Sequence, residues 1–273
     1  MNWRVFDSTG NPIIGIDGND RGLAYGDGVF ETLRVHAAQP IWWREHWQRL
    51  LRGASVLGIA APDETAMLSQ SLQLIAGRSQ GVLKLLLTRG VGGRGYALPE
   101  KSSATVVLSW HPLPNAEPAE GLNLRWCQLR LSEQPVLAGI KHLNRLENVL
   151  ARAEWNDPDI HEGLLLDAQD RLVCATAGNV FLYMDGGWQT PRLDRCGIAG
   201  IARQWILQNL PDAIETELTA EAVQRCDAML VCNSVRGIRA VRRLENRVWP
   251  DHPNVIELRE RLALAEPAFS SAN

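Results

Sequence analysis

The segment Gly139–Glu147, GIKHLNRLE, places Lys141 close behind the apolar run Val136–Ala138. An amine in apolar surroundings loses proton affinity, because desolvation penalises its charged form, and the neutral amine is the better nucleophile toward an aldehyde. These properties suit a lysine that forms a Schiff base. A solvated surface lysine is the competing interpretation. Lys141 is therefore our candidate catalytic residue.

The composition is typical of a soluble globular protein: of 273 residues, 45% are hydrophobic and 22% are charged. The formal net charge of −3 supplies no general attraction for a phosphate polymer or an anionic membrane. The 28 basic residues include only three lysines, Lys84, Lys101 and Lys141, which leaves few side chains for amine chemistry. We expect a small-molecule substrate, and neither a nucleic acid nor a membrane as a partner.

The cysteines indicate a reducing compartment. Five are scattered along the chain without a C-x-x-C pair, so the sequence predicts neither a disulfide framework nor a metal site. Residues 1–7 carry charges where a signal peptide needs an apolar core, and no stretch approaches ~18 consecutive apolar residues. We expect a cytoplasmic protein that is neither secreted nor membrane-spanning.

A proline-rich segment divides the chain at 112–120. Its three prolines remove backbone donors and disfavour regular structure. We predict a small N-terminal α+β domain over 1–111, a linker over 112–120 and a larger C-terminal domain over 121–273. These lengths agree with a prior of roughly 100–200 residues per domain.

Hydrophobic periodicity predicts the elements of both domains. The first domain is expected to contain strands near 29–35, 81–89 and 104–110, and helices over 43–59 and after Pro62. For the second we expect helices over 146–155, over 198–210 and from Pro253, and strands near 123–129, 163–166, 172–175, 179–183 and 228–232. Strict βαβ alternation is missing, so a doubly wound dinucleotide-binding domain is not predicted.

One motif points elsewhere. Residues 90–95, GVGGRG, match the dinucleotide-binding pattern G-x-G-x-x-G and follow an apolar strand. That pattern needs a helix that opens at its last glycine, whereas Tyr96–Pro99 leads into a proline and another strand. We predict a glycine-rich connection that carries Arg94, and no dinucleotide site.

Three segments offer groups that bind a phosphate. Arg49 has a fork-shaped guanidinium, residues 197–203, GIAGIAR, form a glycine-bearing turn into a helix, and Ser234 follows a strand. Each also has a purely structural explanation, as an exposed helix charge, a helix start or a strand cap. Their value lies in their combination with Lys141.

Five segments in this order resemble the fold-type IV enzymes that depend on pyridoxal 5′-phosphate (PLP). They are Arg21–Thr32, the motif His46-x-x-Arg49-Leu50, Lys141–Glu147, Asn179–Phe181 and Gly197–Arg203, and together they extend over nearly the whole chain. This family contains D-amino acid and branched-chain aminotransferases alongside aminodeoxychorismate lyase. The segments Thr88–Tyr96 and Lys141–Glu147 look like the lyase versions.

The resemblance implies an α+β fold. A small N-terminal α/β-sandwich domain would be followed by a larger C-terminal domain with a barrel-like sheet, with PLP held between them in a homodimer. By position, Lys141 would form the Schiff base with the cofactor, and Arg94 and Tyr96 would approach the carboxylates of the substrate. The phosphate would be held by Arg49, Ile201, Ala202 and Ser234.

Cys174 departs from the family pattern. Most of these enzymes have a glutamate five residues before the equivalent of Asn179, where it pairs with the pyridine nitrogen of PLP. A carboxylate keeps that nitrogen protonated and makes the ring an electron sink, which a thiol does far less well. Transamination depends on this sink, whereas the lyase reaction gains driving force from forming an aromatic ring. Cys174 therefore favours the lyase. Two alternatives stay open: a catalytically impaired site, and a neighbouring side chain that substitutes for the glutamate.

The resemblance thus implies an aminodeoxychorismate lyase that converts 4-amino-4-deoxychorismate to 4-aminobenzoate and pyruvate in folate precursor synthesis. Lys141 would serve both as the cofactor anchor and as the general base. Two alternatives stay open: a D-amino acid or branched-chain aminotransferase of the same fold, and a paralogue that binds PLP without turnover.

Overall fold

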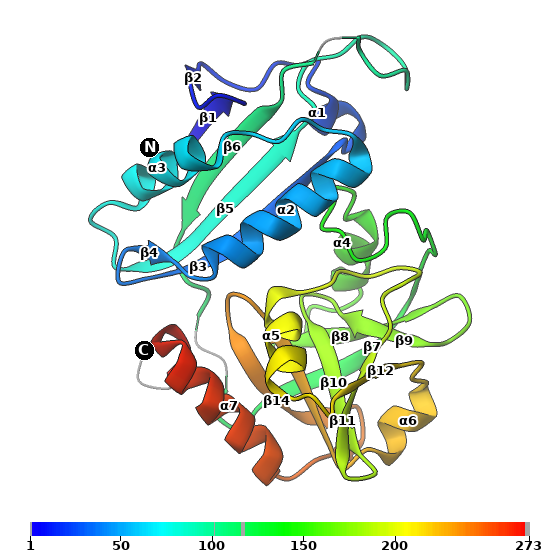
Figure 1. The fold of residues 1–273 in the computed structure, drawn as a ribbon. Coiled ribbons are helices and arrows are strands. Elements are labelled where there is room, and N and C mark those ends of the chain that lie inside the picture. Colours follow the sequence, from blue (N-terminus) through cyan, green and yellow to red (C-terminus); the bar gives the residue numbers. More distant parts are fainter. Residues whose placement is uncertain (1, 101, 116–117, 271–273) are drawn as a thin grey trace. The chain divides into compact units, whose positions relative to one another are not determined.

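The computed structural model describes residues 2–100, 102–115 and 118–270, which form two compact units. The first comprises Met1–Pro114 and Ile140–Asn144, and the second Asn115–Gly139 and Arg145–Asn273 (Figure 1). Residues 116 and 117 of the predicted linker lie outside the described residues.

The short segment Ile140–Asn144 belongs to the first unit, although we expected it within the C-terminal domain. The reason is backbone pairing. The amide of Phe30 donates to the carbonyl of Lys141 at 2.9 Å, and the amide of Leu143 donates to the carbonyl of Gly28 at 2.9 Å. Such long-range pairing is not visible in a local hydrophobic pattern.

The first unit is an antiparallel sheet with helices on one face. Within the described residues the strand order is β2-β1-β6-β5-β3-β4. The helices α2 (Trp43–Leu57) and α3 (Glu64–Ile75) cover one face (Figure 1). The strands are β1 (Trp3–Asp7), β2 (Pro12–Ile13), β3 (Gly28–His36), β4 (Gln39–Pro40), β5 (Gln80–Thr88) and β6 (Thr105–His111).

Alternation along the strands decides which side chains meet the helices. Val29, Leu33 and Val35 of β3 join the buried apolar cluster with α2 and α3, while Phe30 and Thr32 lie on the opposite face. Glu31 shares the helix-facing side with Val29, so β3 brings one carboxylate against α2. The predicted strands and helices of this half are confirmed, and α1 (Arg21–Tyr25) is an additional short helix.

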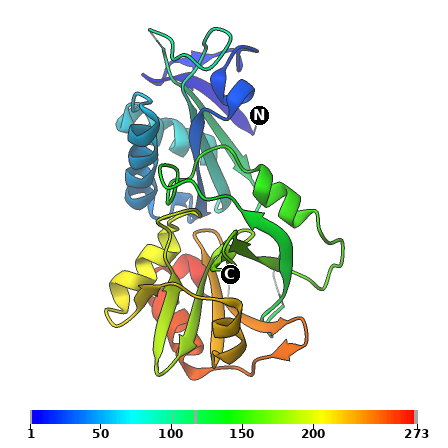
Figure 2. The ribbon, with the colours of Figure 1, turned by 90° about the vertical axis from the view of Figure 1, so that its right-hand side faces the viewer.

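The second unit is built on a curled, mixed sheet. Among the described residues the order is β12-β11-β10-β13-β14-β7-β8-β9, with β15 paired to β14. Because β9 also contacts β10 and β11, the sheet bends back on itself, as the curved β7 shows in Figure 2. The α+β class and the barrel-like second sheet are therefore observed. The strands are β7 (Leu122–Leu131), β8 (Glu162–Asp167), β9 (Leu172–Ala175), β10 (Asn179–Met184), β11 (Gly187–Pro191), β12 (Ile214–Thr216), β13 (Ala228–Asn233), β14 (Gly237–Leu244) and β15 (Arg247–Val248).

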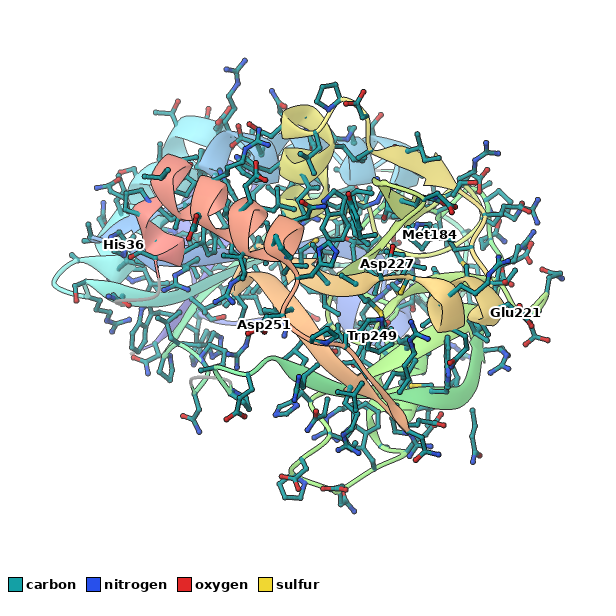
Figure 3. The ribbon with its side chains drawn as sticks, turned by 90° about the horizontal axis from the view of Figure 1, so that it is seen from below. His36, Met184, Glu221, Asp227, Trp249 and Asp251 are labelled. Atoms are coloured by element: carbon teal, nitrogen blue, oxygen red, sulfur yellow. The ribbon has the colours of Figure 1, made fainter. Side chains whose placement is uncertain are left out.

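Four helices accompany this sheet: α4 (Leu146–Arg152), α5 (Ile201–Asn209), α6 (Ala220–Arg225) and α7 (Pro253–Ala265), counted over the described part of the chain. The buried Trp249, labelled in Figure 3, belongs to the core of this unit, and its indole N–H donates to the carbonyl of Cys226 at 3.0 Å. The strand β14 was not predicted, because its three arginines interrupt the apolar alternation. None of the described helices is long and apolar enough to cross a membrane.

The glycine-rich segment 90–95 enters no helix. Residues 91–100 form a bridge, bends and irregular backbone, and Val91 pairs with Asp20 of the same unit. The helix that the dinucleotide-binding pattern needs therefore does not follow residue 95 in the described part of this segment.

Gly28 has a packing role that can be tested. A Cβ atom there would lie 2.4 Å from the carbonyl oxygen of Leu87 and 2.7 Å from the side chain of Leu143, next to the segment that carries Lys141. We expect Gly28→Ala to destabilise the protein by about 1–3 kcal/mol, the usual cost of overpacking. Calorimetric melting should show a lower Tm, whereas Gly93→Ala, which meets open space, should melt like the wild type. Equal melting of the two variants would contradict this packing role.

Candidate active site

Lys141 lies on an irregular segment that is fixed to the edge of β3. Besides the two hydrogen bonds to Phe30 and Gly28, His142 forms an isolated antiparallel bridge with Val29. The Nζ atom of Lys141 lies 4.3 Å from the centre of the Phe30 ring, and the residue is half-buried. The amine is thus held against an aromatic face within the first unit.

Arg49 is fixed by a buried carboxylate. Its Nε atom donates to Oε1 of Glu31 at 2.8 Å and its Nη2 atom donates to Oε2 at 2.5 Å. This bidentate pairing sets the plane of the guanidinium, the geometry that suits a phosphate. The sequence motif identified Arg49 but not its partner Glu31. The alternation of β3 could have revealed Glu31, because it places this carboxylate on the side that faces the helices.

His46 completes this buried group. Its Nδ1 atom lies 2.6 Å from Oε2 of Glu31. Burial raises the pKa of Glu31, but the charges and hydrogen bonds of Arg49 and His46 outweigh that effect and bring it down to about 2. Burial has the largest effect on the pKa of His46 and lowers it, whereas the charge and hydrogen bond of Glu31 raise it. The positive charges of Arg49 and Lys141 also lower it, and the net shift is downward. The ring is therefore neutral at pH 7.

The tautomer of His46 follows from its partner. Because the Glu31 carboxylate only accepts, Nδ1 carries the proton, and Nε2 presents a lone pair. Nε2 is buried and has no hydrogen-bond partner among the described residues. A buried acceptor of this kind is costly unless a donor reaches it.

In the second unit, the start of α5 offers free backbone donors. Its N-cap residue is Gly200, and no side chain within the described residues caps it. The first N–H groups of a helix lack partners inside the helix, so those of Ile201 and Ala202 are available to an anion. The amide of Gly200 donates to Oδ1 of Asn179 at 3.1 Å, and a Cβ atom on Gly200 would lie 2.2 Å from that oxygen. Only glycine fits this helix start.

Ser234 lies in the turn after β13 and is half-buried. Its neighbour Asn233 fixes the turn, because its Oδ1 atom accepts from the amides of Val235 at 3.0 Å and Arg236 at 2.8 Å. The Nδ2 atom of Asn233 donates to the carbonyl of Ala177 at 3.0 Å. The turn that presents Ser234 is therefore held firmly within the second unit.

Cys174 lies on β9, opposite Leu165 of β8, and is 8% exposed. Burial raises the pKa of its thiol to about 12, and the positive charge of Arg145 only partly opposes this. The thiol is thus uncharged at neutral pH. It packs in an apolar cluster with Cys127, Leu131 and Val173.

The two predicted substrate-binding residues lie on the exposed glycine-rich loop. Arg94 is exposed and Tyr96 is 86% exposed. The loop is anchored by Arg21, whose Nη1 atom donates to the carbonyl of Gly95 at 3.1 Å, and by Tyr25, whose hydroxyl accepts from the amide of Gly95 at 3.0 Å. Substrate binding by Arg94 and Tyr96 stays a prediction.

Lys84 is a residue whose position the sequence reasoning missed. It pairs with Thr32 across β3 and β5, and its Nζ atom lies 5.4 Å from the Phe30 ring that Lys141 also contacts. The alternation of β5 could have revealed it, because Lys84 lies on the face of the sheet away from its apolar neighbours Leu83 and Leu85. Two cations therefore lie around one aromatic ring, whereas Lys101 is outside the described residues.

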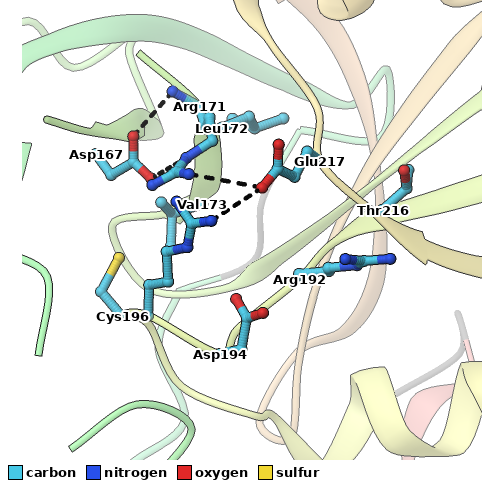
Figure 4. A pocket seen from close by; sticks show the side chains of 10 residues that line it. Asp167, Arg171, Leu172, Val173, Arg192, Asp194, Cys196, Thr216 and Glu217 are labelled. Atoms are coloured by element: carbon cyan, nitrogen blue, oxygen red, sulfur yellow. Dashed lines mark hydrogen bonds and ion pairs between the residues drawn. The ribbon is translucent and has the colours of Figure 1, made fainter. Parts of the chain in front are cut away.

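A small pocket in the second unit holds none of the predicted site residues (Figure 4). Several of the charged side chains that line it form ion pairs. Arg171 pairs with Asp167 at 2.7 Å and with Glu133 at 2.7 Å, and Arg195 pairs with Glu217 at 3.4 Å. We interpret this group as a structural ion-pair network.

The comparisons with known proteins agree with this geometry. The family model described as amino-transferase class IV matches residues 28–244. The chain belongs to this family. It is also 30% identical, over 87% of its length and 90% of the relative's, to an aminodeoxychorismate lyase from Vibrio harveyi.

Two further relatives are a lyase and an aminotransferase. The crystal structure of 4-amino-4-deoxychorismate lyase from Pseudomonas aeruginosa superimposes with a TM-score of 0.90 at 40% identity, covering 97% of this chain and 99% of that one. A D-alanine aminotransferase from Staphylococcus aureus is 25% identical over 83% of each chain. The chain therefore has the fold-type IV architecture that the sequence motifs implied.

The lowered pKa of His46 predicts a pH effect on stability. Below about pH 6.5 the unfolded chain binds a proton at His46 that the folded protein does not, so stability falls as pH decreases, by up to about 1.4 kcal/mol per pH unit. We expect His46→Gln, which keeps an N–H donor for Glu31, to melt with a flatter Tm profile between about pH 7 and pH 5. The exposed His111→Gln is the matched control. An unchanged slope in His46→Gln would contradict the neutral, buried histidine.

Proposed function

We propose that this protein is an aminodeoxychorismate lyase that converts 4-amino-4-deoxychorismate to 4-aminobenzoate and pyruvate for folate precursor synthesis. The observation that carries the proposal is the similarity to proteins of that name, 40% identical over 97% of the chain in one case and 30% over 87% in another. The positions of Lys141 and Arg49 support it, because both are held in place within one unit.

The residues suit PLP as the cofactor at its aldehyde and at its phosphate. Lys141 would bind its aldehyde carbon. Arg49, the backbone N–H groups of Ile201 and Ala202, and Ser234 would hold its phosphate, in agreement with the uncapped start of α5. When bound, PLP withdraws electrons from the amine-bearing carbon of the substrate. Position 174 is the exception, since it supplies a thiol where a carboxylate is usual in the family.

Each side chain has a separate role in the proposed reaction. The amine of Lys141, released by the amine of the substrate, takes the proton from the amine-bearing ring carbon. The carbon–oxygen bond to the enolpyruvyl group then breaks, the ring becomes aromatic, and protonation of the enolpyruvyl group gives pyruvate. Lys84 and Arg94, both cations of the first unit, would bind the two carboxylates, and Tyr96 would contact the ring. Glu31 and His46 act as positioning residues for Arg49.

An aminotransferase is the second candidate, favoured by the 25% identity to a D-alanine aminotransferase. It needs the same lysine and phosphate site, so these residues do not separate the two. Position 174 does, because transfer of the amino group depends more strongly on a protonated pyridine nitrogen. The buried, uncharged Cys174 therefore favours the lyase.

We further propose a cytoplasmic homodimer. Large apolar side chains are exposed on α4, namely Leu146, Val149 and Leu150, and Ile14 is fully exposed in the first unit. Apolar patches of this kind mark interaction surfaces. The described cysteines are all free thiols, as expected in a reducing compartment.

A product assay tests the reaction. Purified protein with PLP and 4-amino-4-deoxychorismate should release 4-aminobenzoate and pyruvate in equal amounts, because each turnover yields one of each. Keto acids from D-alanine or leucine should form far more slowly. Keto acids without lyase products would overturn the proposal in favour of an aminotransferase, and no product from either assay would favour the impaired paralogue.

The anchor role of Lys141 predicts the effect of its removal. Lys141→Ala should lose at least about 10³-fold in turnover, since base catalysis alone contributes roughly 10²–10⁴-fold. Borohydride treatment followed by mass spectrometry should no longer fix PLP to the chain. In Lys84→Ala the attachment should persist while KM for the substrate rises. Attachment of PLP at a residue other than Lys141 would refute the assignment.

A further inference from the structure

A carboxylate directly before β3 holds two arginines of the first unit. Asp27 accepts from Nε of Arg21 at 2.9 Å, and from Nε and Nη2 of Arg89 at 2.7 Å and 3.0 Å. Both arginines are buried. Burial raises the pKa of Asp27, but the hydrogen bonds and charges of Arg89 and Arg21 outweigh that effect and lower it. Asp27 is therefore a charged anchor for both guanidinium groups.

The other donors of Arg21 bind the glycine-rich loop. Nη1 donates to the carbonyl oxygens of Gly95 at 3.1 Å and Ala97 at 3.3 Å, and Nη2 donates to that of Tyr96 at 3.4 Å. Tyr25, at the other end of α1, accepts from the amide of Gly95 at 3.0 Å, and its ring centre lies 5.5 Å from that of Tyr96. One guanidinium thus binds three consecutive carbonyls of the loop.

The far part of this loop has little other support. Within the described residues, the hydrogen bonds that join residues 93–100 to the rest of the chain all come from Arg21 and Tyr25. A Cβ atom on Gly93 or Gly95 would meet open space, and Arg94 between them is exposed. The conformation of a segment with so few contacts depends on those that it has. The placement of Arg94 therefore depends on Arg21.

Arg89 offers a matched comparison, because it has the same carboxylate partner and is also buried. Its Nη2 and Nη1 atoms donate to the carbonyls of Leu57 at 2.6 Å and Gly58 at 2.9 Å, at the end of α2. Loss of either arginine would leave Asp27 with one partner, so both losses should lower stability. Only the loss of Arg21 would release the loop.

We propose that Arg21, held by Asp27, is a positioning residue that fixes the glycine-rich loop and thereby presents Arg94 to a carboxylate of the substrate. The inference rests on the proposed function, in which Arg94 binds that carboxylate. A guanidinium binds a carboxylate in a defined plane, and a loop that is ordered in advance loses less conformational entropy on binding. Because Arg21 acts through the loop, its effect belongs in KM rather than in kcat.

The test compares Arg21→Lys with Arg89→Lys in the full-length protein loaded with PLP. Each variant keeps a positive charge beside Asp27 and removes the planar fork. In Arg21→Lys we expect KM for 4-amino-4-deoxychorismate to rise at least about tenfold, with kcat within about threefold of the wild type, because substrate binding is lost. In Arg89→Lys, KM should stay within about twofold of the wild type, although the Tm of both variants should fall.

A double-mutant cycle shows whether Arg21 acts through Arg94. Arg94→Ala should raise KM by itself. In that background Arg21→Lys should raise KM by less than about twofold, because the loop has no cation to present and the two effects are not additive. Hydrogen exchange followed by mass spectrometry does not depend on turnover. It should show faster exchange over residues 93–100 in Arg21→Lys, and wild-type exchange there in Arg89→Lys.

The outcomes are distinguishable. Additive effects of Arg21→Lys and Arg94→Ala overturn the inference, as does an equal rise in KM for Arg21→Lys and Arg89→Lys, and the proposed function stands in either case. If Arg21→Lys does not fold, Tyr25→Phe, which removes the hydroxyl that binds the Gly95 amide, should raise KM and speed exchange in the loop. No change in either quantity overturns the inference. A wild type that releases no 4-aminobenzoate overturns the proposed function and this inference with it.

Discussion

The pairing of β3 with residues 140–144 is the constraint on which the proposed site depends. Two backbone hydrogen bonds and one bridge fix the lysine segment to a strand whose other residues supply Phe30 and Glu31. Backbone hydrogen bonds of this kind leave little freedom to the residues between them. Lys141 is thereby placed by the geometry of a sheet edge, although its segment has no regular structure of its own.

The buried group of Glu31, His46 and Arg49 fixes the side chain that we propose as a partner of the cofactor phosphate. Burial of the carboxylate would be costly alone, and two partners on α2 compensate for it. Removal of one member of such a group typically costs about 3–5 kcal/mol, because an uncompensated charge stays buried. The same contacts that stabilise the fold thus hold the Arg49 guanidinium in one orientation.

In the proposed function, position 174 would separate the ability to bind PLP from the reactions that bound PLP supports. The lysine, the arginine and the uncapped start of α5 would serve a lyase and an aminotransferase equally well. The electronic state of the ring distinguishes them, since protonation of the pyridine nitrogen governs how much negative charge the ring accepts. In the proposed function, the buried thiol of Cys174 would therefore bear more on the choice of reaction than the phosphate-binding residues would.

Sequence by itself determined the α+β class, most of the long strands and helices, and Lys141, Arg49 and Cys174 as the residues of interest. These features depend on local periodicity and on motif residues, which a single chain displays directly. Tertiary structure alone decided the assignment of Ile140–Asn144 to the first unit, the partners of Arg49, and the approach of Lys84 to the Phe30 ring. The strand β14 was also hidden, because its arginines mask the alternation that reveals other strands. The first three share one physical reason: strand pairing and burial join residues far apart in the chain, and the local pattern does not specify which residues will meet.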